Sequence, residues 1–309
     1  MIPRLFHFVF GLKPTPQPLH LMHYLCLVSC WRVNQPDVVY FHYHHEPYGP
    51  YWDRLKPLLI RRRIEPNRRI ADWRYTSSFI GSYRYAHLSD FARLEILQEY
   101  GGVYADLDTL FVGAIPDALF QYSFVMGHEF PVPIGAEGSL CNAWIASEPG
   151  APFGRRWLRE MEVSFDGSWS SHSTVLPYRL AGAYPDEIQV EPVERFFKIP
   201  PTRQGLAELF LRDGMDLETF LEGVLSLHLW SHLWGERWRV DFSPFHAGCL
   251  TPAYVAHANT LYARLAHPFL TDHPTPRYQY NLERLREDAL EPIYGWAGRI
   301  SRRLMPRNS

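Results

Sequence analysis

Residues 86–112 limit the possible folds of this chain more than any other segment, because they join an apolar helix pattern, a double glycine and a strand pattern. Ser89 can act as an N-cap, and Asp90 then lies where the positive end of the helix dipole favours an anion. The two glycines that follow supply the positive-φ backbone that commonly ends a helix. The segment therefore predicts a largely buried helix over residues 86–100 that turns directly into a strand.

The predicted strand, residues 103–108, carries two aspartates. Side chains alternate along a strand, so Tyr104, Asp106 and Asp108 are expected on one face. Two carboxylates at this spacing repel each other unless solvent, a proton or a cation relieves the repulsion, and oxygen ligands select hard ions such as Mg²⁺ or Mn²⁺. Ligands of α/β sheets bind beyond the carboxyl ends of the strands, so we expect a divalent cation at this pair.

The helix pattern also contains two charged residues within its apolar stripe. At about 100° per residue, Asp90 and Arg93 fall beside Leu94 and Leu97. One interpretation is an i,i+3 ion pair, worth about a few tenths of a kcal/mol if exposed. The alternative is a pair that contacts a ligand.

The combination S-D-x-x-R, apolar helix and G-G-V-Y-x-D-x-D resembles the DxD-containing sugar-transferase family. Its relatives include fungal initiating mannosyltransferases, α-1,4-sugar transferases and the catalytic domains of clostridial glucosylating toxins. A lone D-x-D is expected roughly once by chance in a chain of this length, so the surrounding residues carry the likeness. The resemblance implies a GT-A type α/β fold, in which a Rossmann-like nucleotide-binding sheet is joined to a smaller acceptor-side region.

The resemblance also implies an activity. The chain would be a metal-dependent, retaining hexosyltransferase that uses a nucleotide sugar, with UDP favoured because most of the similar branches use it. The acceptor would be a glycan or a lipid-linked saccharide, as in polysaccharide biosynthesis. The metal would be Mn²⁺ or Mg²⁺, which neutralises the charge that develops on the leaving diphosphate.

Residue roles follow from the same resemblance. Asp108 would ligate the metal directly, and Asp106 would contact the ribose, the sugar or the metal through water. Asp90 would bind a sugar hydroxyl and Arg93 the sugar or a phosphate, with Tyr104 grouped among the donor contacts. Retention is compatible with a same-face attack in which the leaving phosphate oxygen takes the acceptor proton.

Two further stretches are similar to the family in the first half of the chain. IPRLFHFVF contains a predicted strand over 4–10 and would place His7 and Phe8 near the base and ribose, although a core strand with a satisfied histidine is the alternative. CNAWIASEPGAPF contains Asn142, which would reach the sugar or serve as a structural Asn at a strand end. Asn142 and Glu129 are the groups expected near the reacting carbon, and whether either forms a covalent intermediate stays open.

A third stretch, LHLWSHLW, is similar to the late His-Leu-Trp-Asn segment of the α-1,4-transferases. It makes His228 a candidate third metal ligand, and Trp230 or Ser231 a candidate diphosphate contact; Ser231 stands where those relatives carry Asn. A neutral core histidine is the alternative for His228. An aromatic helix face is the alternative for the tryptophans, which recur every four residues at Trp230, Trp234 and Trp238.

The wider pattern predicts an α/β protein with a largely parallel core sheet. The expected strands are 4–10, 37–43, 69–73, 103–108, 123–128, 140–146 and short strands within 188–198. The expected helices are 18–33, 51–60, 86–100, 151–164 and 172–182. We expect one glycosyltransferase domain with a nucleotide-sugar half at 1–115, an acceptor half at 116–270 and a C-terminal tail at 271–309.

Net charge bears on whether the protein binds nucleic acid, and cysteine usage bears on the cellular compartment in which it works. The formal net charge of −2 gives no global basic field for nucleic acid. Cys26 and Cys30 lie on an apolar helical stretch and are expected as buried thiols of a reducing compartment. A strand-like start and the lack of an apolar run of about 20 residues favour a cytoplasmic protein.

The C-terminal tail alternates basic and apolar residues. Its arginines are Arg299, Arg302, Arg303 and Arg307. Such an end can lie on the inner face of an anionic membrane, where a lipid-linked acceptor would be found, or it can be a solvated terminal helix.

The sequence also raises two alternative functions and contains two further local features. A haloacid-dehalogenase-like phosphatase expects D-x-D-x-T, but here Thr109 follows Asp108 directly and no Asp-Asp occurs; a non-catalytic nucleotide-sugar binder is disfavoured by the intact acidic and basic set. His42 and His44 can bind zinc or form a solvated strand end. The Pro-rich loop GLKPTPQP has no phosphate-binding glycine motif, so metal and side chains would hold the diphosphate.

Overall fold

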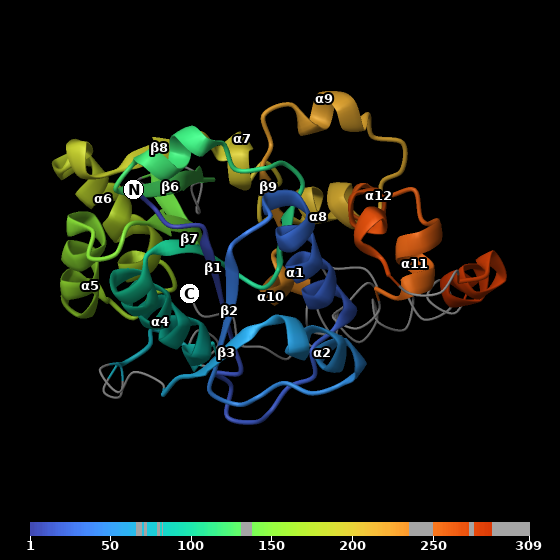
Figure 1. Cartoon of the computed structure of the whole chain (residues 1–309), viewed down its shortest axis with the longest axis horizontal. Helices are drawn as coiled ribbons and strands as arrows, with labels where there is room; N and C mark the ends of the chain where they lie inside the picture. Colours follow the sequence, from blue (N-terminus) through green and yellow to red (C-terminus); the bar gives the residue numbers. More distant parts are fainter. Residues whose placement is uncertain are drawn as a thin grey trace.

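The structure of the chain is a computed structural model that describes residues 1–65, 70, 73–78, 81, 83–130, 138–234, 250–271 and 275–285. Figure 1 shows its central sheet with α4, α5 and α6 on one side and α1, α2, α11 and α12 on the other. This layered arrangement buries both faces of the sheet, as expected of an α/β protein.

The central sheet has seven strands in the order β3-β2-β1-β4-β7-β6-β8. The strands are β1 Leu5–Phe10, β2 Val38–Tyr43, β3 Ile60–Arg63, β4 Gly102–Ala105, β6 Phe124–Glu129, β7 Ser139–Ser147 and β8 Gln189–Glu191. The first four in this order pair in parallel, β7 runs antiparallel to both β4 and β6, and β8 is parallel to β6. The order 3-2-1-4 is that of a nucleotide-binding α/β half, so the predicted class is confirmed.

A second, two-stranded sheet joins β5 (Thr109–Phe111) to β9 (Ser226–His228). The pairing is antiparallel and sets Thr109 opposite His228. It brings a late segment of the chain beside the residues that directly follow β4.

The helices are distributed along the whole described chain. The α-helices are α1 Leu21–Asn34, α2 Pro50–Leu55, α4 Arg84–Tyr100, α5 Pro152–Ser164, α6 Leu176–Ala183, α7 Val193–Phe196, α8 Arg203–Phe210, α9 Leu217–Leu221, α10 Ser231–Trp234, α11 Pro252–His257 and α12 Leu261–Ala266. Short 3₁₀ turns are η1 Lys56–Leu58, η3 Asp117–Gln121, η5 Pro185–Glu187 and η6 His267–Phe269, and η4 Ser171–Val175 is a π-helical turn. Within these described residues, no helix has the length and apolar character that a bilayer crossing requires.

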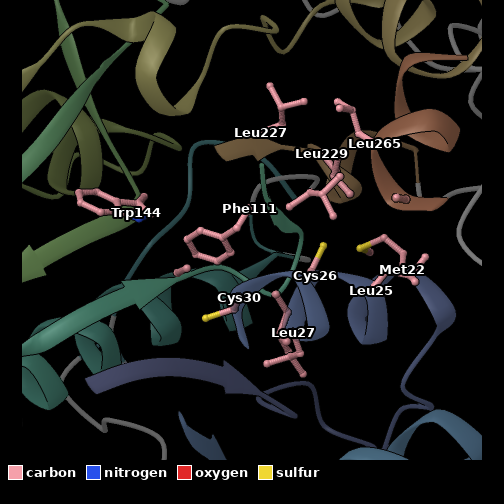
Figure 2. Packing of buried hydrophobic residues seen from close by; sticks show 14 of the residues in the cluster. Met22, Leu25, Cys26, Leu27, Cys30, Phe111, Trp144, Leu227, Leu229 and Leu265 are labelled. Atoms are coloured by element: carbon pink, nitrogen blue, oxygen red, sulfur yellow. The ribbon is translucent and has the colours of Figure 1, made fainter. Parts of the chain in front are cut away.

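Alternation along β4 separates two hydrophobic cores. Val103 and Ala105 belong to the core that contains α1, whereas Tyr104 packs into the core under α4 and α5. Figure 2 shows part of the α1 core, where Cys26 and Cys30 lie among apolar side chains. Both cysteines are free and buried, as predicted.

Most of the predicted elements are confirmed, with ends that differ by a few residues. The exceptions have local causes. The predicted strand near 69–73 is wrong where it can be compared: the third parallel strand is β3, Ile70 lies in a 3₁₀ turn, and residues 69, 71 and 72 lie outside the described part. The segment 188–198 forms β8 and then the helix α7, so only its first part is extended.

The helix before the DxD begins earlier than predicted. Tyr83 is the N-cap of α4, without a side-chain cap, so Ser89 lies inside the helix and Asp90 is not in its first turn. The predicted glycine stop is confirmed, because Gly101 has φ +65° and caps α4, and Gly102 has φ +100°. A Cβ on Gly102 would lie 2.4 Å from the Leu5 carbonyl oxygen, so this position also needs the small residue for close strand packing.

Candidate active site

A cavity of about 720 Å³ lies at the carboxyl ends of β1 and β4. Phe10 and Gly11 line it from the end of β1, and Asp106 and Asp108 line it from the turn after β4. Small-molecule pockets are typically roughly 300–1,000 Å³ and, in open α/β sheets, occur at this edge. The cavity therefore has both the size and the place of a ligand site.

The two aspartates of the DxD lie in a turn rather than on a strand. Strand β4 ends at Ala105, and the backbone N–H of Thr109 donates to the Asp106 carbonyl at 2.9 Å. The predicted strand over 103–108 is therefore wrong beyond Ala105, and alternation does not explain why the two carboxylates are close. The turn itself delivers both of them to the cavity.

His228 lies beside the two aspartates and completes a group of three side chains. Because β5 pairs with β9, His228 Nε2 lies 3.0 Å from Asp108 Oδ1 and 4.0 Å from Asp106 Oδ2. One ligand atom from each of Asp106, Asp108 and His228 lies within 4.8 Å of the other two. Two carboxylate oxygens and an imidazole nitrogen fit a divalent ion such as Mn²⁺, so these side chains could hold the metal that a DxD site generally uses.

Electrostatics distinguish the two aspartates. Burial raises the pKa of both, but for Asp108 it is outweighed by His228 and by the Ser231 backbone N–H, which donates to Oδ2 at 2.8 Å, so its pKa falls below the ordinary value. The pKa of Asp106 is raised by burial despite Arg93. The pKa of His228 is raised because Asp108 and Asp106 outweigh burial. The two aspartates thus favour the protonated form of His228 when no metal ion is bound.

Asp90 and Arg93 form the expected i,i+3 pair, but it is buried and forms part of a larger network. Arg93 Nη2 lies 3.2 Å from Asp90 Oδ1 and 3.4 Å from Asp106 Oδ1. Arg93 also donates to the Asn142 carbonyl at 2.5 Å. Burial alone would raise the pKa of Asp90, yet Arg93 and His172 hold it below its ordinary value. Both Asp90 and Arg93 line the cavity, so the ion-pair and ligand interpretations are compatible.

Asn142 and Tyr104 support these acids in different ways. Asn142 Nδ2 donates to Asp90 Oδ1 at 2.7 Å, and the residue itself lines the cavity. Tyr104 is buried behind the site, and its hydroxyl donates to Asp106 Oδ1 at 2.5 Å. Tyr104 does not line the cavity, so the structure makes it a support for Asp106 rather than a donor contact.

Trp230 and Ser231 both line the cavity beside His228. Trp230 adopts a positive φ of 54°, and its indole donates to the Ile199 carbonyl at 2.8 Å. Helix α10 begins only after it, at Ser231, so Trp230 is not on a helix face. Trp238 lies outside the described residues.

His7 and Phe8 are not brought to the cavity. Both are fully buried, and His7 Nε2 contacts the Gly101 carbonyl at 2.8 Å while Nδ1 contacts His42 Nε2 at 3.1 Å. Burial lowers the pKa of His7 to about 4, which keeps the ring neutral. The expected contact with base and ribose does not fit this placement, because β1 reaches the cavity only from Val9 onward.

Glu129, at the end of β6, is a cavity carboxyl with an unusual environment. Its Oε2 atom is buried and has no hydrogen-bond partner among the described residues. Burial raises its pKa to about 7, although His228 opposes this. A carboxyl that is half protonated near neutral pH and lies close to His228 is a candidate for proton or glycosyl chemistry.

The sequence did not single out several residues that the structure places at the site. His172 lies in the π-helical turn, and its Nε2 atom is 3.1 Å from Asp90 Oδ2. Together with His87 and Asp90 it forms a second buried group, in which one ligand atom from each residue lies within 4.8 Å of the other two. Arg93 already balances Asp90, so this group acts first as a support for that carboxylate. Lys13 and His23 also line the cavity. The only sequence signal for them is their place after the first strand, where α/β proteins bind phosphates.

Comparison with known proteins finds a likeness in the first half of the chain. Residues 27–125, which include α4 and the DxD, match the family described as the glycosyltransferase sugar-binding region containing a DXD motif. This part of the chain is therefore similar to the sugar-binding region of DXD-containing glycosyltransferases, in line with the resemblance seen in its sequence. The observed mixed sheet agrees with the GT-A type fold expected for it.

One relative gives a more particular likeness. The chain is 34% identical over 211 residues to glucan organizing enzyme 1 of Cryptococcus neoformans var. grubii serotype A, over 64% of this chain and 54% of that protein. The chain thus spans about half the length of this relative.

Solved structures give only distant likenesses. They include the glycosyltransferase GlyE of Streptococcus pneumoniae TIGR4 (12% identity, TM-score 0.47, 88% of this chain and 61% of that one) and the galactosyltransferase LgtC in complex with donor and acceptor sugar analogs (12% identity, TM-score 0.41, 90% and 99%). At TM-scores below 0.5 these likenesses do not bear on residue roles.

Proposed function

We propose that the chain is a metal-dependent, retaining glycosyltransferase that moves a hexosyl group from a nucleotide sugar, UDP-sugar first among them, to a saccharide acceptor. The observation that carries the proposal is the convergence of Asp106, Asp108 and His228 within 4.8 Å at the wall of the cavity. The match of residues 27–125 to a sugar-binding region supports the donor class.

In this proposal Asp108 and His228 hold the ion, with Asp106 completing the group. Asp108 suits direct ligation, because its low pKa keeps it ionised and the Ser231 N–H fixes its orientation. Asp106 is held from behind by Tyr104 and Arg93, so its carboxylate is oriented before any ligand arrives. When bound, Mn²⁺ would supply Lewis-acid neutralisation of the negative charge on the diphosphate leaving group.

Asp90, Arg93 and Asn142 form the sugar side of the proposed site. Asp90 is held by Asn142, Arg93 and His172, so its carboxylate can accept from a sugar hydroxyl without first reorganising. Arg93 spans Asp90 and Asp106, which links the sugar side to the metal side. We assign these residues to sugar orientation.

Glu129 is our candidate for the group nearest the reacting carbon. Two retaining routes remain, a covalent intermediate on Glu129 and a same-face attack in which the leaving phosphate oxygen takes the acceptor proton. The routes predict different effects of Glu129→Gln. The covalent route requires the carboxylate, so the variant would lose transfer; the same-face route needs only a polar group, so transfer would fall modestly.

Aromatic side chains favour a saccharide acceptor. Trp169 lines the cavity, is 37% exposed, stacks on His232 at 5.6 Å and meets Tyr83 edge-on at 5.7 Å. Such flat apolar surfaces suit the apolar face of a sugar ring. The tail at 271–309 was expected to contact a membrane, but its arginines Arg299, Arg302, Arg303 and Arg307 lie outside the described residues, so a lipid-linked acceptor stays a hypothesis.

The test is a panel of UDP- and GDP-sugars incubated with and without Mn²⁺, followed by detection of free nucleoside diphosphate and of transfer to oligosaccharides. We expect turnover of at least one donor that requires the metal. Asp108→Asn should lose it, whereas the exposed control Glu222→Gln should keep it. The proposal is wrong if no donor is bound or turned over and the Asp108 variant behaves as wild type toward metal; phosphate release from simple phosphomonoesters would instead favour a phosphatase.

A further inference from the structure

The wall of the cavity formed after β1 carries basic and hydrogen-bond-donating groups that the mechanism above does not use. Lys13 comes from the Pro-rich loop, His20 is the N-cap of α1, and His23 lies in the first turn of that helix. All three residues line the same cavity as Asp106 and Asp108. The cavity therefore has an acidic side, which contains Asp106 and Asp108, and a hydrogen-bond-donor side, called the donor side below, which contains Lys13, His20 and His23.

The donor side is compact and lies near the proposed metal group. The rings of His20 and His23 are 5.8 Å apart, and Phe10 packs edge-on against His23 at 5.4 Å. Burial is the main cause of the lowered pKa of both histidines, and Lys13 lowers each further, while Asp108 opposes this at His23. Lys13 is thus close to both rings, and His23 is close enough to Asp108 to feel its charge.

Hydrogen bonding fixes which ring nitrogen of His23 carries the proton. The backbone N–H of His20 donates to His23 Nδ1 at 3.2 Å, so Nδ1 acts as an acceptor. Burial lowers the pKa of His23 to about 3, so the ring is neutral and its single proton is on Nε2. His23 therefore presents an N–H donor, and Lys13 an ammonium, without requiring the histidine to titrate.

The backbone adds to this arrangement. Helix α1 has 14 residues and begins at the cavity, with Leu21 and Met22 also lining it. The N-terminal end of a helix that follows the first strand is where α/β proteins hold a diphosphate, by orphan N–H groups and the helix dipole. The loop after β1 has no glycine motif whose backbone N–H groups could bind phosphate. The side chains of Lys13 and His23 supply hydrogen-bond donors in its place.

We propose that Lys13 and His23, together with His20 and the first turn of α1, bind the diphosphate of the nucleotide donor beside the Asp106, Asp108 and His228 group. This proposal rests on the proposed function. An anion needs such partners, because the two aspartates repel it except through a metal ion. Lys13 and His23 would also stabilise the negative charge that builds on the diphosphate as the sugar leaves.

The experiment measures binding by full-length protein, in Mn²⁺, of inorganic pyrophosphate, UDP, GDP and the matching monophosphates by titration calorimetry. The variants are Lys13→Met, which removes the charge of an exposed side chain, and His23→Phe, which keeps the ring volume without nitrogen. Lys56→Met is the matched control, since Lys56 pairs with Glu46 and does not line the cavity. Circular dichroism and thermal unfolding confirm that each variant folds.

We expect Lys13→Met and His23→Phe each to weaken binding of pyrophosphate and of the nucleoside diphosphate about tenfold, as for a charge-assisted hydrogen bond. Monophosphate binding should change less, Lys13→Arg should restore most of the affinity, and the Lys56 control should match wild type. Equal diphosphate and pyrophosphate affinity in wild type, Lys13→Met and His23→Phe would overturn the proposal. Wild-type turnover judges the proposed function separately, because it does not depend on these variants.

Discussion

Glu129 offers a test of the electrostatics of the site that does not depend on the identity of the substrates. Its side chain is half-buried overall, but Oε2 is fully buried and has no hydrogen-bond partner among the described residues. Burial raises its pKa from 4.5 to about 7. A carboxyl whose pKa is raised in the folded state destabilises the protein when it is ionised.

The sign follows from the protons bound in each state. Below pH 4.5 the carboxyl is protonated in both the folded and the unfolded chain, so its contribution vanishes. Between pH 4.5 and about 7 the folded state retains the proton, and the free energy of unfolding falls as pH rises. Above that range the full cost is reached, about 2–3 kcal/mol for a shift of this size at a half-buried side chain.

Glu129→Gln removes this cost because the amide cannot ionise. We expect the variant to be about 2–3 kcal/mol more stable than wild type at pH 8 and nearly equal to it at pH 4.5. Urea unfolding followed by tryptophan fluorescence across this pH range measures the difference, with EDTA present so that no bound cation stabilises the carboxylate. Glu222→Gln, an exposed change, should give a pH-independent difference near zero.

The result that would refute the reasoning is a constant difference between Glu129→Gln and wild type from pH 4.5 to 8. It would mean that water reaches Oε2 and that the carboxyl titrates as an ordinary surface group. A variant that is less stable at all pH values would show that Glu129 accepts a hydrogen bond that Gln does not reproduce.

Two other substitutions test how the site is supported. Arg93→Met should lower the free energy of unfolding by about 3–5 kcal/mol at pH 7, since it leaves buried Asp90 and half-buried Asp106 without the guanidinium; urea unfolding should show a smaller loss at pH 4, and a loss below about 1 kcal/mol would contradict a buried network. Gly102→Ala should lower the free energy of unfolding by about 1–3 kcal/mol, because φ is +100° and the new Cβ would lie 2.4 Å from the Leu5 carbonyl oxygen. The control Gly182→Ala, where a new Cβ meets nothing within 4 Å, should change it little in the same assay.

Local sequence patterns predicted much of the first half of the sheet. Helix α4, its glycine stop and strand β4 follow from apolar spacing and from the positive φ that glycine permits. The third strand was predicted too late in the sequence, because all four residues of IRRR at β3 are exposed and the segment has no buried apolar alternation. An edge strand of this kind is stabilised by pairing with β2, which a sequence pattern does not report.

The site was only partly predictable, for a physical reason. Asp106 and Asp108 lie two residues apart in one turn, so their proximity follows from local chain geometry. His228 reaches them only through the β5–β9 pairing, which joins segments more than a hundred residues apart in the sequence. The family resemblance made His228 a candidate ligand, whereas no motif marks Lys13 and His23, which the fold of the loop after β1 and the start of α1 brings to the cavity.

Arg93 shows why spacing alone undervalued this network. On an exposed helix an Asp and an Arg three residues apart contribute a few tenths of a kcal/mol, roughly, and constrain little. Here the same pair is buried, and the guanidinium also contacts Asp106 and the Asn142 carbonyl. Any movement of Asp90 would therefore leave a buried charge without its partner, which costs far more than the pair contributes at a surface. The network fixes Asp90 relative to Asp106, so in the proposed transferase the arrangement of these two carboxylates is set by burial before any ligand binds.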